Sequence, residues 1–238
     1  MKKYFPLILL IVALLAACAR TEEPRPKPTP IPATPIPPPP ERIQKATNVS
    51  FSNYSKEFPV NWQWIDPDEN VEPTPHNTKQ RVLSVTVPTG KDLSADKQNA
   101  PRYLKALEGD FDIQTRVVGL PKLNYQAAGL IIYWNRENFV RLDRYFGGGE
   151  GIALSVTDSD GRREIASAPT DLQQVDLRLV RHGGEVTAFW RPDDKSDWME
   201  IGRLTVSYPD VVLTGLAAYN TAEPFAVEFA YVKLFPLK

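Results

Sequence analysis

Cysteine, histidine and an excess of either charge are what this sequence has least of. Cys18 is the single cysteine, and the two histidines are His76 and His182. Clusters of cysteine and histidine, which hold structural zinc, therefore have no material. Lys and Arg total 28 and Asp and Glu total 29, so the basic surface of a nucleic-acid-binding protein is not expected. The sequence thus predicts no metal, no cofactor and no nucleic-acid partner.

Helical patterns and catalytic motifs are also scarce. No stretch of about ten residues or more has a convincing helical pattern. No Gly-x-Ser-x-Gly elbow occurs and both histidines fall in predicted loops or turns, so a Ser-His-Asp hydrolase is not expected. Residues 158–161 begin like a calcium loop, but no glutamate follows at the required position, and we interpret them as a hairpin turn. The three glycines at 147–149 precede a predicted strand rather than a helix, so they do not indicate a phosphate site.

The longest apolar run lies at the N-terminus. Two lysines precede it, and it ends at Leu15-Ala16-Ala17-Cys18. A basic start, an apolar stretch and small residues are typical of a secretory signal peptide, and the run is shorter than the roughly 20 apolar residues of a membrane span. The last four residues resemble the bacterial lipobox, whose cysteine accepts a diacylglycerol. We therefore interpret residues 1–17 as a lipoprotein signal peptide and Cys18 as the lipidation site; a plain signal peptide is the alternative.

Proline dominates residues 18–41, which follow the signal. The segment contains four consecutive prolines at 37–40. Repeated proline favours an extended polyproline II chain, and such a composition forms no packed core. We interpret 18–41 as a disordered, semi-rigid linker between a lipid anchor and one domain at 42–238. The expected location is extracytoplasmic, anchored to the cell membrane, or to the outer membrane if the organism has one, which Ala19 favours.

Apolar side chains recur at every second position through most of the domain, which predicts β-strands. Strands are expected at 80–87, 110–117, 127–134, 139–144, 152–157, 163–167, 175–179, 186–191, 199–204, 212–218 and 227–234. Glycine-containing hairpins are expected at 158–161 and 182–184. Many short strands with such turns predict an all-β sandwich or barrel. Two long loops, 66–79 and 88–100, are candidates for function.

Three stretches of the chain resemble the DUF1349 family. They are 100–113, with Ala-Pro-Arg-Tyr-Leu and Leu-Glu-Gly-Asp-Phe-Asp-Ile; 128–142, with Ala-Gly-Leu-Ile and Asn-Phe-Val-Arg-Leu; and 177–198, with Leu-Arg-Leu-Val-Arg-His-Gly-Gly, Val-Thr-Ala-Phe and a tryptophan. Residues 193–197 replace the usual Ser-x-Asp-Gly turn, so this hairpin is expected to be longer or differently shaped. The resemblance covers roughly 49–234 and implies an antiparallel β-sandwich, a concanavalin A-like jelly roll. Relatives occur as accessory domains of glycosidases and in envelope proteins, so carbohydrate binding is the implied function.

Glycosidases of this fold carry carboxylates at alternating strand positions. Glu108, Asp110 and Asp112 have this spacing, and a retaining pair would need carboxyl groups about 5–5.5 Å apart. However, Glu108-Gly109 has the composition of a turn, and the Glu-x-Asp-x-x-Glu pattern of the glucanases is absent. We therefore expect a solvated strand face here rather than a catalytic site.

Sugar binding needs an exposed aromatic ring together with planar polar groups. Aromatic residues also fill sandwich cores, and the candidates are Trp62, Trp64, Tyr133, Trp134, Tyr145 and Trp190. Alternation places Phe139, Arg141 and Asp143 on one strand face. We predict an exposed ligand-binding set on the concave face, made by Tyr133, Arg141, Asp143 and Arg178.

These observations favour a membrane-tethered lipoprotein whose β-sandwich binds a polysaccharide or another envelope component without catalysis. Two other functions stay open. A structural or protein-interaction lipoprotein would present a flat apolar patch instead of a groove lined by Trp, Arg and Asp. A divergent glycoside hydrolase would need two carboxylates that face each other in a cleft.

Replacing Cys18 with serine removes the thiol that lipidation requires. The Cys18→Ser protein is expected to leave the membrane or to remain an uncleaved precursor, because no thioether to a diacylglycerol forms. Separation of cells into membrane and soluble parts, followed by immunoblotting, measures both. Normal processing together with membrane retention of the variant would contradict the interpretation.

Overall fold

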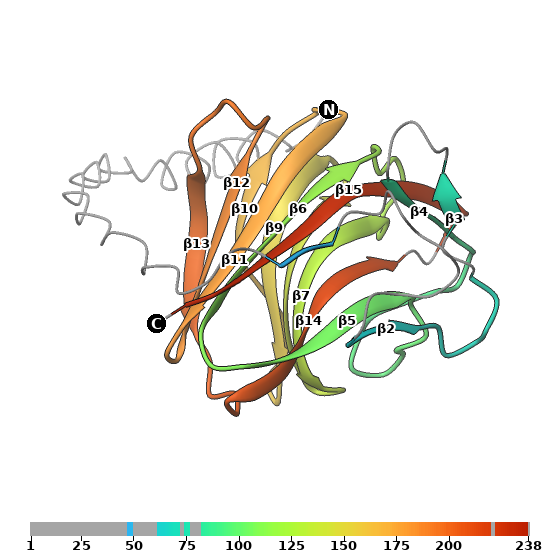
Figure 1. Cartoon of the computed structure of the whole chain (residues 1–238). Coiled ribbons are helices and arrows are strands. Elements are labelled where there is room, and N and C mark those ends of the chain that lie inside the picture. The colour runs from blue at the N-terminus through green and yellow to red at the C-terminus, as the bar shows by residue number, and fades with distance from the viewer. Residues whose placement is uncertain (1–46, 50–60, 72–73, 77–81, 220–221, 238) are drawn as a thin grey trace, which may run out of the picture. The chain divides into compact units, whose positions relative to one another are not determined.

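A computed structural model describes residues 47–49, 61–71, 74–76, 82–219 and 222–237, with the backbone alone in 47–49 and 74–76. The regular structure in these ranges is β-strand (Figure 1). Within them, no helix is long and apolar enough to cross a membrane. The all-β prediction is therefore confirmed.

The described strands form two antiparallel sheets that stack as a sandwich (Figure 1). The eight-stranded sheet has the order β13 (Met199–Thr205), β12 (Glu185–Arg191), β11 (Gln174–His182), β6 (Phe111–Val118), β15 (Phe225–Pro236), β4 (Val82–Val87) and β3 (Thr74–His76), with β1 (Thr47–Val49) also paired to β15. The seven-stranded sheet has the order β10 (Gly161–Pro169), β9 (Glu150–Asp158), β8 (Asn138–Phe146), β7 (Ala127–Asn135), β14 (Val211–Tyr219), β5 (Arg102–Glu108) and β2 (Trp62–Ile65). Of the two architectures left open by the strand pattern, the structure is the sandwich.

Every strand predicted between 80 and 234 occurs, with ends displaced by a few residues. The two predicted hairpins also occur: Asp158 and Gly161 face each other across one turn, and His182 and Glu185 across the other. The predicted loop 66–79 is wrong in part, because β3 lies inside it. Strand β5 was not predicted. Its first three residues, Arg102 to Leu104, are all buried, because both faces of this strand are covered and alternation is lost.

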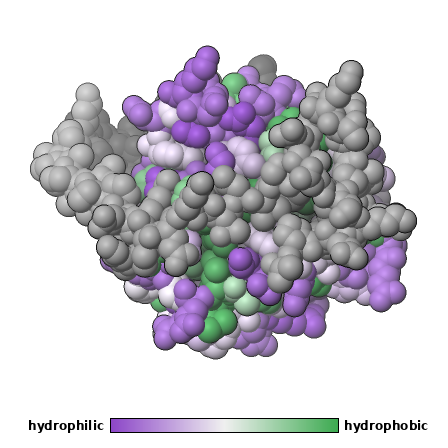
Figure 2. Space-filling view, viewed as in Figure 1, coloured by the Kyte–Doolittle hydropathy of each residue, from purple (hydrophilic) through white to green (hydrophobic). Residues whose placement is uncertain are grey.

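The main core lies between the sheets and is filled by the inward-facing side chains of both. Ile113, Leu130, Leu142, Leu154 and Leu177 are among its fully buried members. Where Figure 2 is not drawn in grey, the visible surface is largely hydrophilic, with some hydrophobic areas. The burial of the core side chains is the main source of stability of such a sandwich.

Three of the candidate sugar-binding aromatics belong to this core instead. Trp62 is buried and stacks on Tyr103, with ring centroids 4.7 Å apart. Trp64 and Trp190 are partly buried and pack against the same core. As alternation requires, Trp62 and Trp64 share a face of β2, and that face is turned inward.

A second buried layer covers the outer face of the seven-stranded sheet. Residues 91–100, called the strap below, lie in the predicted loop 88–100. Leu93 and Ala100 of the strap pack on outward-facing side chains of β5, β7, β8 and β14: Leu104, Ala127, Ile131, Phe139, Ala217 and Tyr219. The seven-stranded sheet is therefore buried on both faces over these strands.

A buried lysine holds the start of the strap. The ammonium of Lys91 lies 2.8 Å from Asp66 Oδ1 and 3.0 Å from Asp68 Oδ2, and the residue is 1% exposed. Burial acts to raise the pKa of Asp66, but the hydrogen bond and charge of Lys91, with backbone hydrogen bonds, outweigh it and lower that pKa. The strap thus begins at a satisfied ion pair.

The close approach of β7 and β8 requires glycine at position 129. A Cβ there would lie 2.0 Å from the carbonyl oxygen of Leu142 and 2.9 Å from Asp143 Cα. We expect Gly129→Ala to lower the free energy of unfolding by about 3 kcal/mol or more, as overpacking against backbone does. Urea unfolding measures it.

Gly149→Ala is the matched control for that variant. A Cβ at Gly149 would meet nothing within 4 Å, so its effect is expected to stay within about 0.5 kcal/mol. Equal midpoints for the two alanine variants would contradict the close approach of the strands.

Candidate functional site

The outer face of the seven-stranded sheet carries a pocket of about 530 Å³ beside the strap. Four parts of the chain line it: the strap (Asp92, Leu93, Ser94), the segment before β7 (Tyr125, Gln126), strand β8 and its end (Arg141, Tyr145, Phe146, Gly147), and strand β10 (Arg162, Glu164), with Ala127 and Tyr219 also contributing. A pocket of this volume is within the usual range for small-molecule sites.

Three buried polar residues form the floor of this pocket and the layer beneath it. Arg141 and Asp143 follow each other at alternate positions of β8, so both side chains leave the same face. Tyr219, at the end of β14, donates its hydroxyl hydrogen to Asp143 Oδ2 at 2.7 Å. Arg141 Nη1 donates to the carbonyl oxygen of Leu93 at 2.8 Å, and Arg141 Nε lies 3.7 Å from Asp143 Oδ2. The floor is thus tied to the strap by one arginine.

Aromatic rings hold this arginine in place. Its guanidinium carbon lies 4.7 Å from the ring centre of Tyr219 and 5.4 Å from that of Phe139. Attraction between a cation and the face of an aromatic ring is strengthened where water is excluded, and Arg141 is 1% exposed. The charge is therefore fixed in position rather than free to follow solvent.

The electrostatics of the floor are dominated by burial. Burial raises the pKa of Asp143, while the charge of Arg141 and the hydrogen bond from Tyr219 act in the opposite direction. Burial also raises the pKa of Tyr219 well above its usual value, so its hydroxyl remains a donor. Asp143 Oδ1 and Arg141 Nε are buried and have no hydrogen-bond partner among the described residues. Such unmet groups are uncommon and call for a reason.

Two tyrosines supply the aromatic part of the pocket. The Tyr145 ring lies between two glycines: a Cβ at Gly147 would come within 2.8 Å of it and one at Gly151 within 3.1 Å. Tyr125 is 64% exposed at the rim and has a positive φ of 76°, a conformation that non-glycine residues rarely adopt. Gln126 accepts backbone hydrogen bonds from residues 122 and 123, which fixes this segment.

The structure brings two of the four predicted ligand-binding residues together in this place. Arg141 lines the pocket and Asp143 contacts it from below. Tyr133 lies on the same sheet face but under the strap, where its hydroxyl donates to Gln98 Oε1 at 2.9 Å. Arg178 is wrong as a member of this set, because β11 belongs to the other sheet.

The expected exposure of this set is also wrong. Arg141 is 1%, Asp143 2% and Arg178 9% exposed. Arg141 contacts the strap, whereas Arg178, on the other sheet, lies against the rings of Phe189 and Trp198. Tyr145 was among the candidate aromatics, whereas Tyr125 was not predicted. Tyr125 lies outside the strands, in a segment without periodicity, so no sequence pattern indicated it.

Of the three carboxylates predicted to be solvated, Glu108 is exposed and Asp110 partly exposed, whereas Asp112 is buried. Asp112 is 0% exposed, and Arg178 donates to it from Nε at 3.1 Å and lies within 3.0 Å through Nη2. Glu108 ends β5, and the positive φ of 74° at Gly109 turns the chain before β6. Asp110 lies 2.7 Å from His182 Nδ1. The three carboxylates therefore do not form one strand face.

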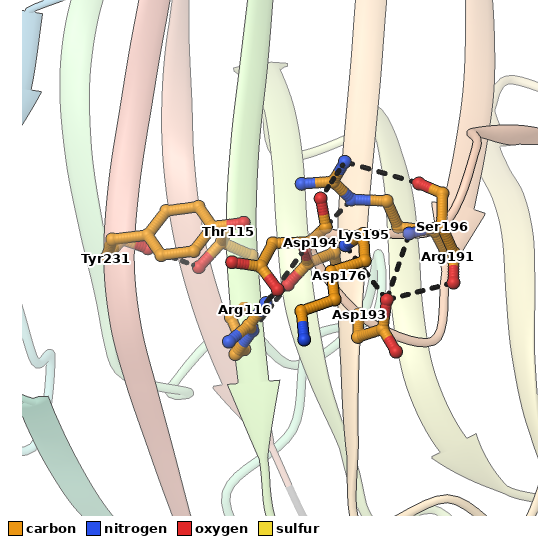
Figure 3. Close-up of polar contacts among 9 residues, drawn as sticks. All are labelled: Thr115, Arg116, Asp176, Arg191, Asp193, Asp194, Lys195, Ser196 and Tyr231. Atoms are coloured by element: carbon orange, nitrogen blue, oxygen red, sulfur yellow. Dashed lines mark hydrogen bonds and ion pairs between the residues drawn. The ribbon is translucent and has the colours of Figure 1, made fainter.

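Asp176, Arg116 and Arg191 form an ion cluster, called the Asp176 cluster below, on the outer face of the eight-stranded sheet (Figure 3). Asp176 is 0% exposed and accepts hydrogen bonds from Arg116 at 2.6 and 3.2 Å and from Arg191 at 2.9 Å. The hydrogen bond with Asp176 raises the pKa of Arg116. One carboxylate therefore holds two cations from β6 and β12, across the strand β11 that carries it.

The same cluster explains the unusual β12–β13 turn (Figure 3). Arg191 Nη1 reaches the carbonyl oxygens of Asp194 and Ser196 at 3.4 Å, and its guanidinium lies 4.3 Å from the ring centre of Trp198. Asp193 Oδ1 accepts from Ser196 Oγ and from the backbone N–H groups of residues 195 and 196, each at 2.9 Å. These contacts lower the pKa of Asp193, the Ser196 side chain most. The longer turn is thus packed onto the sheet.

Another cavity, of about 420 Å³, lies where the β9–β10 turn meets the segment after β13. Its lining includes Asp158, Arg163 and Tyr208. Asp158 and Arg163 form an ion pair, and the exposed Trp134 lies 6.0 Å from Tyr208 between ring centres. Among the described residues, no group of three or more His, Cys, Asp or Glu side chains is placed to hold a metal ion.

A family model described as a protein of unknown function, DUF1349, matches residues 67–236. The chain belongs to the DUF1349 family. The resemblance carried by the three sequence stretches is confirmed. The pocket, the strap and the Asp176 cluster all lie within the part of the chain that the DUF1349 model matches. No curated protein matches the chain.

Solved structures place this DUF1349 domain among concanavalin A-like sandwiches. The GH43 protein BlXynB from Bacillus licheniformis has a TM-score of 0.64 at 12% identity, covering 78% of this chain and 38% of its own. For xylan beta-1,4-xylosidase from Bacillus halodurans C-125 the TM-score is 0.63 and the identity 15%, and the match covers 90% of this chain and 41% of that protein. For the exoplasmic/lumenal domain of VIP36, in its Ca²⁺/Man-bound form, the TM-score is 0.50 and the identity 17%, and the match covers 77% of this chain and 85% of that one. The chain thus spans about two fifths of the two bacterial proteins, and these identities show the fold alone.

The Asp176 cluster is expected to stabilise this DUF1349 sandwich. Asp176→Asn removes the negative charge between Arg116 and Arg191, and we expect a loss of about 3 kcal/mol, as when one partner of a buried pair is removed. Asp194→Asn is the matched control. Its side chain is 71% exposed at 4.0 Å from Arg116, so a change within about 1 kcal/mol is expected. Urea midpoints that fall equally for both variants would refute the assignment.

Proposed function

We propose that this chain is a lipid-anchored, extracytoplasmic protein that binds carbohydrate without catalysis in the pocket above Arg141. The observation that carries the proposal is the composition of that pocket. Buried Arg141 lines it together with three tyrosines, Tyr125, Tyr145 and Tyr219, and buried Asp143 contacts Arg141 and Tyr219.

Sugar recognition needs both kinds of group. The apolar C–H face of a pyranose packs on an aromatic ring, while its hydroxyls pair with planar polar side chains, which fix orientation. A hydroxyl both donates and accepts a hydrogen bond. Arg141 lines the pocket, and the unmet donor Arg141 Nε and the unmet acceptor Asp143 Oδ1 are both buried beneath the pocket surface, which supports a water held beneath a hydroxyl-bearing ligand.

The states of the carboxylates favour binding over hydrolysis. Asp143 accepts from the Tyr219 hydroxyl and lies against Arg141. Asp92 accepts from the Leu93 N–H and the Ser94 hydroxyl, and so forms part of the strap turn. A glycosidase uses two carboxyl groups that flank the scissile bond. Asp92 and Glu164 are the carboxylates that line this pocket. Because Asp92 is already bonded within the strap, Glu164 of β10 has no second carboxylate with which to flank a scissile bond.

Similar folds support carbohydrate as the ligand class. One similar structure is named a xylan beta-1,4-xylosidase, and another was determined in a Ca²⁺/Man-bound form. This support is an analogy of fold, and the choice of ligand rests on the pocket itself.

The anchor is the second half of the proposal. The lipobox-like end of the signal at Cys18 and the proline-rich residues 18–41 support a domain held at a distance from a membrane surface. A binding module in that position retains envelope or environmental glycan at the cell surface.

The purified protein would be run in native gels that contain xylan, xyloglucan, mannan or cell-wall glycan. One of these is expected to retard it. Tyr125→Asn removes the exposed ring and suits the positive φ, so it is expected to weaken retardation at least about tenfold, or 1.4 kcal/mol. Trp134→Ala removes an exposed ring near the other cavity and is expected to leave binding unchanged.

The alternatives predict different results in the same gels. Release of reducing sugar during incubation would favour a hydrolase. Loss of binding in Trp134→Ala but not in Tyr125→Asn would move the site to the cavity near Tyr208. No retardation by any glycan would contradict the proposal and favour a protein partner.

A further inference from the structure

We propose that the pocket accepts the end of a glycan chain and excludes its interior, because the strap covers the sheet face next to the pocket. This inference rests on the proposed carbohydrate-binding function. It names the part of the polymer that the site recognises. Three features carry it: the extent of the strap, its fixation and the walls of the pocket.

The strap covers the surface that an extended ligand would need. Beneath it, one outward-facing residue from each of four strands is at most 2% exposed: Leu104, Ile131, Phe139 and Ala217. Ser155 and Thr157, on the outward face of β9, are 1% and 2% exposed. An internal stretch of polymer must enter a site on one side and leave on another. On the side next to the strap, the sheet face is already covered by the protein's own side chains.

The strap is bonded along its whole length, and so it is a wall rather than a lid. Its first residue, Lys91, is held by two aspartates. Its middle is held by Arg141 at the Leu93 carbonyl and by Arg136, whose Nε donates to the Ala95 carbonyl at 2.7 Å. Near its end, Gln98 accepts from the Tyr133 hydroxyl at 2.9 Å.

The remaining sides of the pocket are also built from side chains. Arg162 and Glu164 stand on β10, and Tyr125 with Phe146 stands at the opposite corner. A chain end brings hydroxyl groups that a linkage would otherwise remove, and these are the groups that an arginine, a glutamate and a tyrosine pair with. A pocket of about 530 Å³ holds a small ligand rather than a polymer segment that passes through.

The test counts chain ends at constant mass. Xylan and mannan would each be used intact and after partial acid cleavage, with binding sites per gram measured by isothermal titration against the purified protein. Sites per gram are expected to rise in proportion to chain ends, and the Kd per end to stay constant through the oligomer series. Reduction of the reducing ends with borohydride tells which end is bound.

Two results would go against the proposal in distinguishable ways. Sites per gram that stay constant on cleavage, with affinity that grows with oligomer length, would overturn chain-end recognition and leave carbohydrate binding intact. No heat with intact or cleaved xylan or mannan, with no retardation in any glycan gel, would refute the proposed function itself.

A variant tests whether the strap imposes this preference. Arg136→Ala removes the hydrogen bonds from Arg136 to the carbonyls of Ala95 and Asp96, and faster hydrogen exchange in the strap would report its loosening. We expect this variant to bind more sites per gram of intact polymer while its affinity for short oligomers is retained. Arg163→Ala, an exposed arginine near the other cavity, is the control. If hydrogen exchange shows a loosened strap but the number of binding sites per gram of intact polymer is unchanged, the strap does not impose the preference for chain ends.

Discussion

The burial of both faces of the seven-stranded sheet is the constraint on which the rest of the structure depends. One face packs on the other sheet, and the other packs under residues 91–100. Any polar side chain that leaves the covered part of the outer face must therefore find partners within the protein. Arg141 meets this need through the Leu93 carbonyl, two aromatic rings and Asp143. The pocket exists where the covering layer ends.

The two outer faces treat their charges differently. On the eight-stranded sheet, Asp176 is shared by two arginines at short distance, and Arg178 pairs with Asp112. On the seven-stranded sheet, Asp143 Oδ1 and Arg141 Nε lack hydrogen-bond partners among the described residues. A buried group without a partner costs stability and calls for a reason. Arg181 Nε on the eight-stranded sheet and Arg144 Nε on the seven-stranded sheet also lack partners among the described residues, so in the proposed function it is their position at the pocket that distinguishes Arg141 and Asp143.

Alternation along the strands carried most of what the sequence could predict. It placed Ile113 and Val117 in the core, and Arg141 with Asp143 on one outward face. It did not reveal β5, since both of its faces are covered at the start. It also did not separate Arg178 from Arg141, because alternation gives the face within a strand and not the sheet to which the strand belongs. The predicted exposure of Arg141 and Asp143 was wrong for a similar reason, because the residues that cover them are distant in sequence.

The strap also bears on how such a domain diversifies. It is one surface segment, and the closure entropy of a loop rises by only about 0.6 kcal/mol for each doubling of its length. No residue of the strap belongs to the core between the sheets or to the Asp176 cluster. In the proposed function, selectivity for ligand length would therefore change through insertions and deletions in one loop, without replacement of Arg141, Asp143 or Tyr219.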